Sequence, residues 1–215
     1  MGEFVGRGRK ARRCYGFDEI SLVPGEVTVN PAEVDTGWEV NGKRFRVPII
    51  AAAMDGVVDV SFAVKMSQLG GVAVLNLEGV QTRYENPNEV LDRIASASAE
   101  EATKLVQDVY LEPIKEKLIS QRIQEIKKGK GIAAVSTIPQ KAERYGPIAQ
   151  EAGCDLFMVQ STVTTVKHIS TAYKTLEFRK FCKAMKIPVI IGNAVTYPVV
   201  LDLLDTGAAA LLIGI

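Results

Sequence analysis

Val47-Pro48-Ile49-Ile50-Ala51-Ala52-Ala53-Met54 is apolar from end to end and shows no alternation of apolar and polar residues. A strand of this composition is buried on both faces, as in a parallel sheet that helices cover. Five more apolar runs follow along the chain: Val72-Ala73-Val74-Leu75, Ile132-Ala133-Ala134-Val135, Leu156-Phe157-Met158-Val159, Val189-Ile190-Ile191 and residues 209–213. Because amphipathic stretches separate these runs, they predict repeated strand–helix units and one parallel sheet.

Start and stop signals mark the helices between the runs. Asp59 is placed to cap a helix that Gly70-Gly71 ends. Pro139 suits the first turn of another helix, which closes at Gly153. We expect residues 165–185 to form one longer helix and residues 198–204 a short one.

The connection between the second and third apolar runs, about residues 78–131, is longer than a simple loop and reads as helical. Three apolar stripes at helical spacing run through it: Val90, Leu91 and Ile94; Leu105, Val106 and Val109; Ile114, Leu118, Ile123 and Ile126. We expect this connector to pack against the outside of the sheet or against a neighbouring subunit.

These elements fit the first six strand–helix units of a (β/α)8 TIM barrel better than a Rossmann sheet. The glycine pattern G-x-G-x-x-G of a Rossmann dinucleotide site does not follow the first strand. A closed barrel usually needs about 250 residues, and this chain has 215. We therefore interpret residues 1–215 as one incomplete barrel domain with an N-terminal tail at 1–14, and we expect the parent protein to continue beyond the last strand.

Composition describes an ordinary globular protein. The chain is 47% hydrophobic and 24% charged, with a formal net charge of +1. This balance argues against a nucleic-acid or membrane partner held by broad electrostatics, and the basic run at residues 7–13 is interpreted as a solvated tail. No apolar run reaches the roughly 18 residues of a membrane span, and no signal-peptide core is present, so we expect a cytoplasmic protein.

The cysteines and the single histidine offer no catalytic centre. Cys14, Cys154 and Cys182 are few, odd in number and without a CxxC pairing, which is typical of free thiols in a reducing compartment. In a barrel, neither Cys154 nor Cys182 would lie at the C-terminal end of a strand, where catalytic groups gather. His168 is expected inside the longest helix as a surface or interface residue, and no metal site is predicted.

The C-terminal ends of the predicted strands carry small residues, amides and hydroxyls. They comprise Ala53-Met54-Asp55, Asn76-Leu77-Glu78, Ser136-Thr137, Gln160-Ser161-Thr162, Gly192-Asn193 and Gly214-Ile215. In a barrel these ends form the active-site face. Such a rim can hydrogen-bond a sugar, an amide or a base, but it contains neither a metal-ligand cluster nor a pair of carboxylates suited to acid–base chemistry.

Motifs along nearly the whole chain resemble the IMP dehydrogenase and GMP reductase family. They are Tyr15-Gly16-Phe17-Asp18-Glu19-Ile20-Ser21-Leu22-Val23-Pro24, residues 47–57, Leu69-Gly70-Gly71-Val72-Ala73-Val74-Leu75-Asn76, Ile190-Ile191-Gly192-Asn193-Ala194-Val195-Thr196 and residues 207–215. The chain is most similar to the IMP dehydrogenase-like branch that lacks CBS domains, because the connector at 78–131 is too short to hold that pair of regulatory domains.

The resemblance implies an enzyme of purine biosynthesis on the route to GMP. Family members oxidise IMP to XMP with NAD through a cysteine thioimidate, use potassium, and form homo-oligomers, here a homotetramer or an octamer. Their cysteine lies on a loop directly after the sixth strand, which places it beyond residue 215. The resemblance therefore implies no catalytic residue within this chain, and the 215 residues alone are expected to be inactive.

Site residues carry over by position. Ala51, Met54 and Asn193 match substrate-binding positions, with Met54 expected to pack against the base and Asn193 to lie beside the reacting centre. Five further residues match cofactor-binding positions: Gln160, Ser161, Thr162, Gly214 and Ile215.

Three departures from the family pattern keep two alternatives open. Ala51 replaces a serine of many relatives, Gln160 an aspartate that orients the cofactor, and Asn76 a histidine. A GMP reductase would share the fold but consume NADPH to convert GMP to IMP. A non-catalytic nucleotide-binding regulatory protein is the other alternative, while the opening at residues 17–24 favours the dehydrogenase.

Overall fold

The computed structural model describes residues 3–11 and 13–214, which divide into the units Met1–Asp35 and Thr36–Ile215. The first unit contains an antiparallel pair of short strands and two single-turn 3-10 helices: β1 (Glu3–Phe4), β2 (Lys10–Ala11), η1 (Phe17–Glu19) and η2 (Pro31–Glu33). Its two strands pair with each other and form a sheet of their own.

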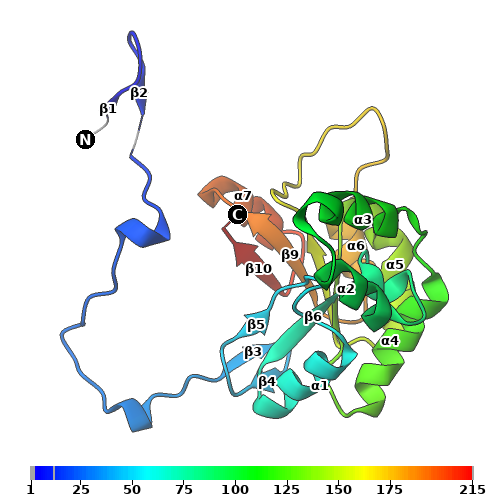
Figure 1. Ribbon diagram of the computed structural model, residues 1–215. Helices are drawn as coiled ribbons and strands as arrows, with labels where there is room; N and C mark the ends of the chain where they lie inside the picture. The colour runs from blue at the N-terminus through cyan, green and yellow to red at the C-terminus, as the bar shows by residue number, and fades with distance from the viewer. Residues whose placement is uncertain (1–2, 12, 215) are drawn as a thin grey trace. The chain divides into compact units, whose positions relative to one another are not determined.

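The second unit is built on a parallel sheet of six strands. The sheet order follows the chain order, and the strands are β5 (Ile50–Ala51), β6 (Val72–Asn76), β7 (Ala134–Thr137), β8 (Leu156–Gln160), β9 (Val189–Ala194) and β10 (Ala210–Ile213). All five pairings are parallel, and the sheet curls into part of a barrel (Figure 1). This confirms the expected first six strands of a (β/α)8 barrel.

Helices connect the strands. They are α1 (Val60–Leu69), η3 (Val80–Thr82), α2 (Pro87–Ala95), α3 (Ala99–Leu111), α4 (Glu116–Lys128), α5 (Pro139–Glu151), α6 (Phe178–Ala184) and α7 (Tyr197–Leu204). Of these, α1, α5 and α7 lie where the sequence predicts helices. Asp59 caps α1, because its carboxylate accepts a hydrogen bond from the Phe62 amide at 2.6 Å. Gly70 ends α1 in the left-handed conformation, with φ 96°. The connector is helical, as expected.

The predicted helix over 165–185 is wrong for most of its length. Residues 161–177 form no helix, and α6 begins only at Phe178. Serine side chains bond to nearby backbone here: Ser161 donates to the Val163 carbonyl at 2.9 Å, and Ser170 accepts from the Ala172 amide at 3.1 Å. Because such local bonds compete with helix formation, His168 lies on a loop after β8 rather than inside a helix.

The two faces of the sheet carry separate apolar cores. Alternate strand residues, among them Leu75, Val135 and Phe157, face the helices α1, α4, α5, α6 and α7. The residues between them form the inner face: Val72, Val74, Ala134, Leu156, Met158 and Ile190. The strands β3 (Trp38–Val40) and β4 (Lys43–Phe45) form a hairpin that buries Val40 and Phe45 against this inner face.

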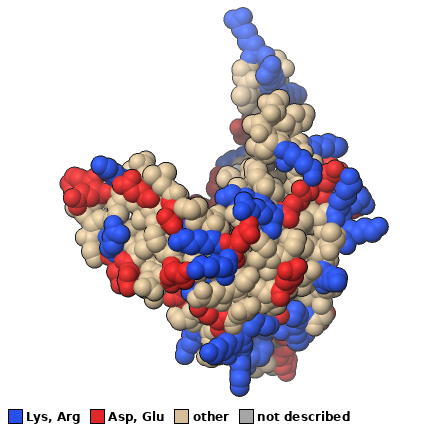
Figure 2. Space-filling model, turned by 90° about the vertical axis from the view of Figure 1, so that its right-hand side faces the viewer, with Lys and Arg blue, Asp and Glu red and all other residues tan. Residues whose placement is uncertain are grey.

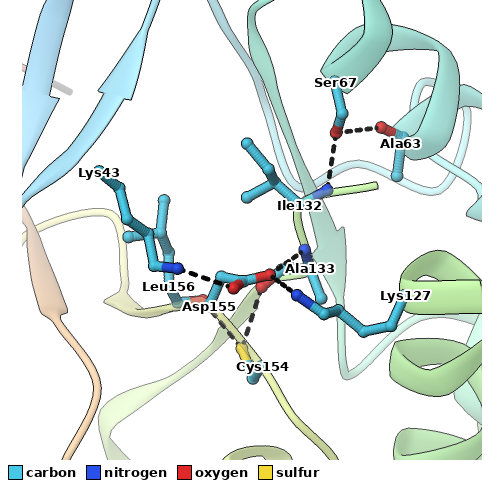
Figure 3. Close-up of polar contacts among 9 residues, drawn as sticks. All are labelled: Lys43, Ala63, Ser67, Lys127, Ile132, Ala133, Cys154, Asp155 and Leu156. Carbon is cyan, nitrogen blue, oxygen red and sulfur yellow. Dashed lines mark hydrogen bonds and ion pairs between the residues drawn. The ribbon is translucent and has the colours of Figure 1, made fainter. Parts of the chain in front are cut away.

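One carboxylate links the hairpin, the sheet and a helix at the N-terminal end of the strands (Figure 3). Asp155, just before β8, accepts hydrogen bonds from Lys43 of β4 at 2.9 Å, from Lys127 of α4 at 2.7 Å and from the Ala133 amide at 2.9 Å. Burial works against its ionisation, but these three donors outweigh burial and lower the pKa of Asp155. Beside it, burial raises the pKa of the Cys154 thiol to about 12, so the thiol keeps its proton at neutral pH.

Replacing this carboxylate tests its role in stability. A group whose pKa is lowered by folding stabilises the protein above its unfolded pKa, and the contribution is lost as the pH falls through the folded pKa. At pH 7 we expect D155N to lower the free energy of unfolding by about 1–3 kcal/mol. The difference from wild type should shrink below about pH 4, as measured by urea unfolding across pH.

The exposed pair Lys174–Glu143 supplies the control, because both of its side chains are more than half exposed. E143Q should change the free energy of unfolding by less than about 0.5 kcal/mol. A D155N protein as stable as E143Q at pH 7 would contradict the assigned role.

Candidate functional site

Polar side chains gather where the parallel strands end. Asn76 ends β6, Thr137 ends β7, Gln160 ends β8, and Asn193 is the penultimate residue of β9. Met54 follows β5 by three residues and is 57% exposed. Because the strands are parallel neighbours, these groups share one edge of the sheet (Figure 1).

Two adjoining hollows open at this edge. One of about 410 Å³ is lined by Met54, Asn76, Glu78, Thr137 and Gln160, among others. The other, of about 210 Å³, is lined by Asn193, Gly214 and apolar residues of the inner face. Ala52, Ala53 and Gln160 line both hollows, which therefore form one continuous surface at the rim. An apolar wall with a few fixed polar groups is the usual make-up of a small-molecule site.

Gln160 and Asn193 lie together between the hollows. The Gln160 amide nitrogen donates to the Asn193 side-chain oxygen at 2.9 Å. This bond leaves the Asn193 amide nitrogen as a donor and the Gln160 oxygen as an acceptor toward a ligand. The pair is uncharged and suits the recognition of a neutral heterocycle or carboxamide.

The segment after β8 is tied to β9 through backbone and hydroxyl bonds. The Ser161 amide donates to the Gly192 carbonyl of β9, and the Asn193 amide donates back to the Ser161 carbonyl, both at 3.0 Å. The Thr164 hydroxyl donates to the Gly192 carbonyl at 2.6 Å. Thr162, between them, is exposed. The structure thus brings Gln160, Ser161 and Asn193 together.

Of the other predicted site residues, Gly214 lines a hollow and Ala51 does not. Gly214 lines the smaller hollow. The side chain of Ala51 packs against the helix-facing core instead, and Ala52 and Ala53 line the hollows in its place. Ile215 lies outside the described residues.

Glu78 organises the rim in a way that sequence reasoning did not assign. Its carboxylate accepts hydrogen bonds from the Thr137 hydroxyl at 2.9 Å, the Ile138 amide at 2.7 Å and Lys141 at 2.7 Å. These bonds place a negative charge at the N-terminus of α5, where the helix dipole favours it. A glutamate two residues beyond a strand end was the only sequence signal, and its three partners lie far along the chain.

A small cavity of about 60 Å³ lies between α5 and the loop after β8. His168 and Gln140 both hydrogen-bond the Tyr173 hydroxyl, at 2.8 and 3.1 Å, and the His168 and Tyr173 rings are stacked. The predicted helix over 165–185 hid this arrangement, because it placed His168 away from the strand ends.

The match to a known family covers these elements. The model of the IMP dehydrogenase / GMP reductase domain matches residues 14–215. The chain belongs to this family.

The relatives that match nearly all of this chain are oxidoreductases whose names give no substrate. The chain is 30% identical over 215 residues to an uncharacterized oxidoreductase of Mycolicibacterium smegmatis, covering 98% of this chain and 57% of the relative. An uncharacterized oxidoreductase of Mycobacterium tuberculosis is 31% identical with the same coverage. The inosine-5'-monophosphate dehydrogenase of Methanocaldococcus jannaschii is 34% identical over 67 residues, 31% of this chain.

A solved structure has the same fold. The IMP dehydrogenase/GMP reductase-like protein of Corynebacterium glutamicum superimposes with a TM-score of 0.91 at 30% identity, covering 98% of this chain and 56% of that protein. The chain thus spans little more than half the length of these relatives.

The described residues offer mixed surface charge, but neither a helix suited to a membrane nor a group of metal ligands. Acidic and basic side chains are interspersed on the face drawn in Figure 2. Ion pairs such as Arg144–Glu116 join side chains of opposite charge. Within residues 3–11 and 13–214, no helix is both long and apolar enough to cross a membrane. In the same residues, no group of three or more His, Cys, Asp or Glu side chains could hold a metal ion.

Neutralising Glu78 tests whether it orders the rim. In E78Q, the Ile138 amide loses a charged acceptor and Lys141 loses its partner, so we expect hydrogen exchange at Ile138 to accelerate about tenfold. E116Q is the matched control, because Glu116 also reaches α5 from another element but pairs with Arg144 in an exposed position. Equal exchange at Ile138 in both variants would show that Glu78 does not order this turn.

Proposed function

We propose that the protein oxidises IMP to XMP with NAD. The observation that carries this proposal is the juxtaposition of Met54, Gln160 and Asn193 at the strand ends of a chain that belongs to the IMP dehydrogenase / GMP reductase family. Met54 offers a polarizable surface to a planar base, while the two amides offer one donor and one acceptor to its edge. A neutral purine such as hypoxanthine matches this set.

The residues beside Asn193 fit the dinucleotide. Ser161 and Thr162 supply hydroxyls and Gln160 an amide, which suit ribose and carboxamide groups. NAD, when bound, accepts the hydride that leaves the purine. The chain's own residues hold the base at the rim and keep the ring beside the cofactor position, and Gly214 continues that surface along the edge of β10.

The nucleophile we propose is a cysteine beyond residue 215. Of the two cysteines in the unit that carries the sheet, Cys154 is buried before β8 at the opposite end of the strands, and Cys182 lies on α6. Neither can reach a base at the rim. We further propose, from the family, dependence on potassium, a cytoplasmic homotetramer or octamer, and a place in purine and GMP biosynthesis.

The reaction is tested in the full-length protein with IMP and NAD. We expect IMP-dependent formation of NADH, followed by absorbance, together with release of XMP. NADPH consumption with GMP and no turnover of IMP would instead identify a reductase. Tight nucleotide binding without either reaction would identify a binding protein and contradict the proposed catalysis.

Removing the Asn193 amide tests the site itself. We expect N193A to lower kcat/KM for the nucleotide about a hundredfold, since the ligand loses a positioned donor and Gln160 loses its partner. N88A, on the exposed face of α2, should leave kcat/KM unchanged. An N193A enzyme as active as N88A would remove Asn193 from the site.

A further inference from the structure

The connector helix α3 reaches the loop that carries Met54. The Tyr110 hydroxyl, from the last turn of α3, donates a hydrogen bond to Oδ2 of Asp55. The same oxygen accepts from the Val80 amide at 2.8 Å. Asp55 directly follows Met54, so these two bonds act on the residue next to the proposed base contact.

Asp55 sits inside a tight turn. The Met54 carbonyl accepts hydrogen bonds from the amides of Val57 at 3.0 Å and Val58 at 2.9 Å, and the Met54 amide donates to Ala52 at 2.8 Å. Val58 is buried in the helix-facing core. The backbone on either side of Met54 is thus fixed, and the side chain of Asp55 ties the turn to η3 and α3.

Gly79 allows the close approach of Asp55. A Cβ at this position would lie 1.7 Å from Oδ1 and 2.3 Å from the carboxyl carbon of Asp55. Oδ1 is buried and has no hydrogen-bond partner among the described residues. The carboxylate is therefore held through Oδ2 alone, and Tyr110 supplies one of its two bonds.

Arg83 fixes Tyr110 from the other side. Its guanidinium lies 5.3 Å from the centre of the Tyr110 ring and donates to the carbonyls of Glu78, at 3.1 Å, and Glu112. Burial and the neighbouring Asp55 raise the pKa of Tyr110, so the phenol keeps the proton that it donates. The tyrosine is thus held between the end of β6 and the Met54 turn.

We propose that Tyr110 is a positioning residue that sets the Met54 turn for the purine base through its hydrogen bond to Asp55. This inference rests on the proposed function. It gives the connector a role in the site beyond packing, because α3 supplies a bond that the barrel strands do not.

The matched pair Y110F and Y84F tests the proposal in the full-length protein. Both variants remove one hydroxyl from the connector, but the Tyr84 hydroxyl donates to the Val109 carbonyl and not to Asp55. We expect Y110F alone to accelerate hydrogen exchange at the Val57 and Val58 amides and to weaken IMP binding, each about tenfold. G79A should reproduce both effects, since it displaces the same carboxylate.

A merely structural role is separated by a double-mutant cycle. If Tyr110 acts through Met54, Y110F should weaken IMP binding in the wild-type background but not in an M54A background. Additive losses in the two backgrounds, or equal behaviour of Y110F and Y84F, would overturn the proposal. Exchange that accelerates while IMP affinity stays constant would overturn it as well.

Failure of the proposed function gives a different pattern. A wild-type protein that binds neither IMP nor GMP would reject the purine site. The exchange rates of Val57 and Val58 would still decide whether Tyr110 holds the turn, because they are read without ligand.

Discussion

The parallel direction of the six strands is the constraint on which the rest of the structure depends. Parallel neighbours bring every C-terminal end to one edge, so residues as distant as Met54 and Asn193 share one surface. The same direction brings the N-terminal ends together at the opposite edge. There Asp155 joins the β3–β4 hairpin, the sheet and α4 through Lys43 and Lys127. The contacts of Asp155 and the proposed site therefore lie at opposite ends of the same strands.

The helical connector at residues 78–131 is held by its own apolar core and by α4. It has a small core of its own around Val80, Val90 and Val109. Arg122 of α4 anchors its first part by donating to the carbonyls of Gln81, Tyr84 and Glu85 at 3.0, 3.1 and 2.7 Å. Because these contacts anchor the connector, Tyr110 is held at a fixed distance from the barrel, as a positioning residue requires.

The sequence predicted the strands because each contains a short apolar run without alternation, as in a parallel sheet that helices cover. The predicted helix failed over residues 165–177, where hydroxyl side chains bond to nearby backbone. The direction of the Ala51 side chain could not be predicted from alternation along the strand, since β5 has only two residues, Ile50–Ala51. The roles of Glu78 and Tyr110 could not be assigned from the sequence, because the hydrogen-bond partners of their side chains are 55 or more residues away and are known only from the fold.

The most direct measurement of the central claim is a crystal structure of the full-length protein with IMP bound. We predict the purine ring against Met54, with its edge within hydrogen-bond distance of Asn193 and Gln160 at the strand ends of β8 and β9. A nucleotide bound elsewhere on the protein, or these three side chains far from an ordered purine, would contradict the assignment of this rim as the site of a purine nucleotide oxidoreductase.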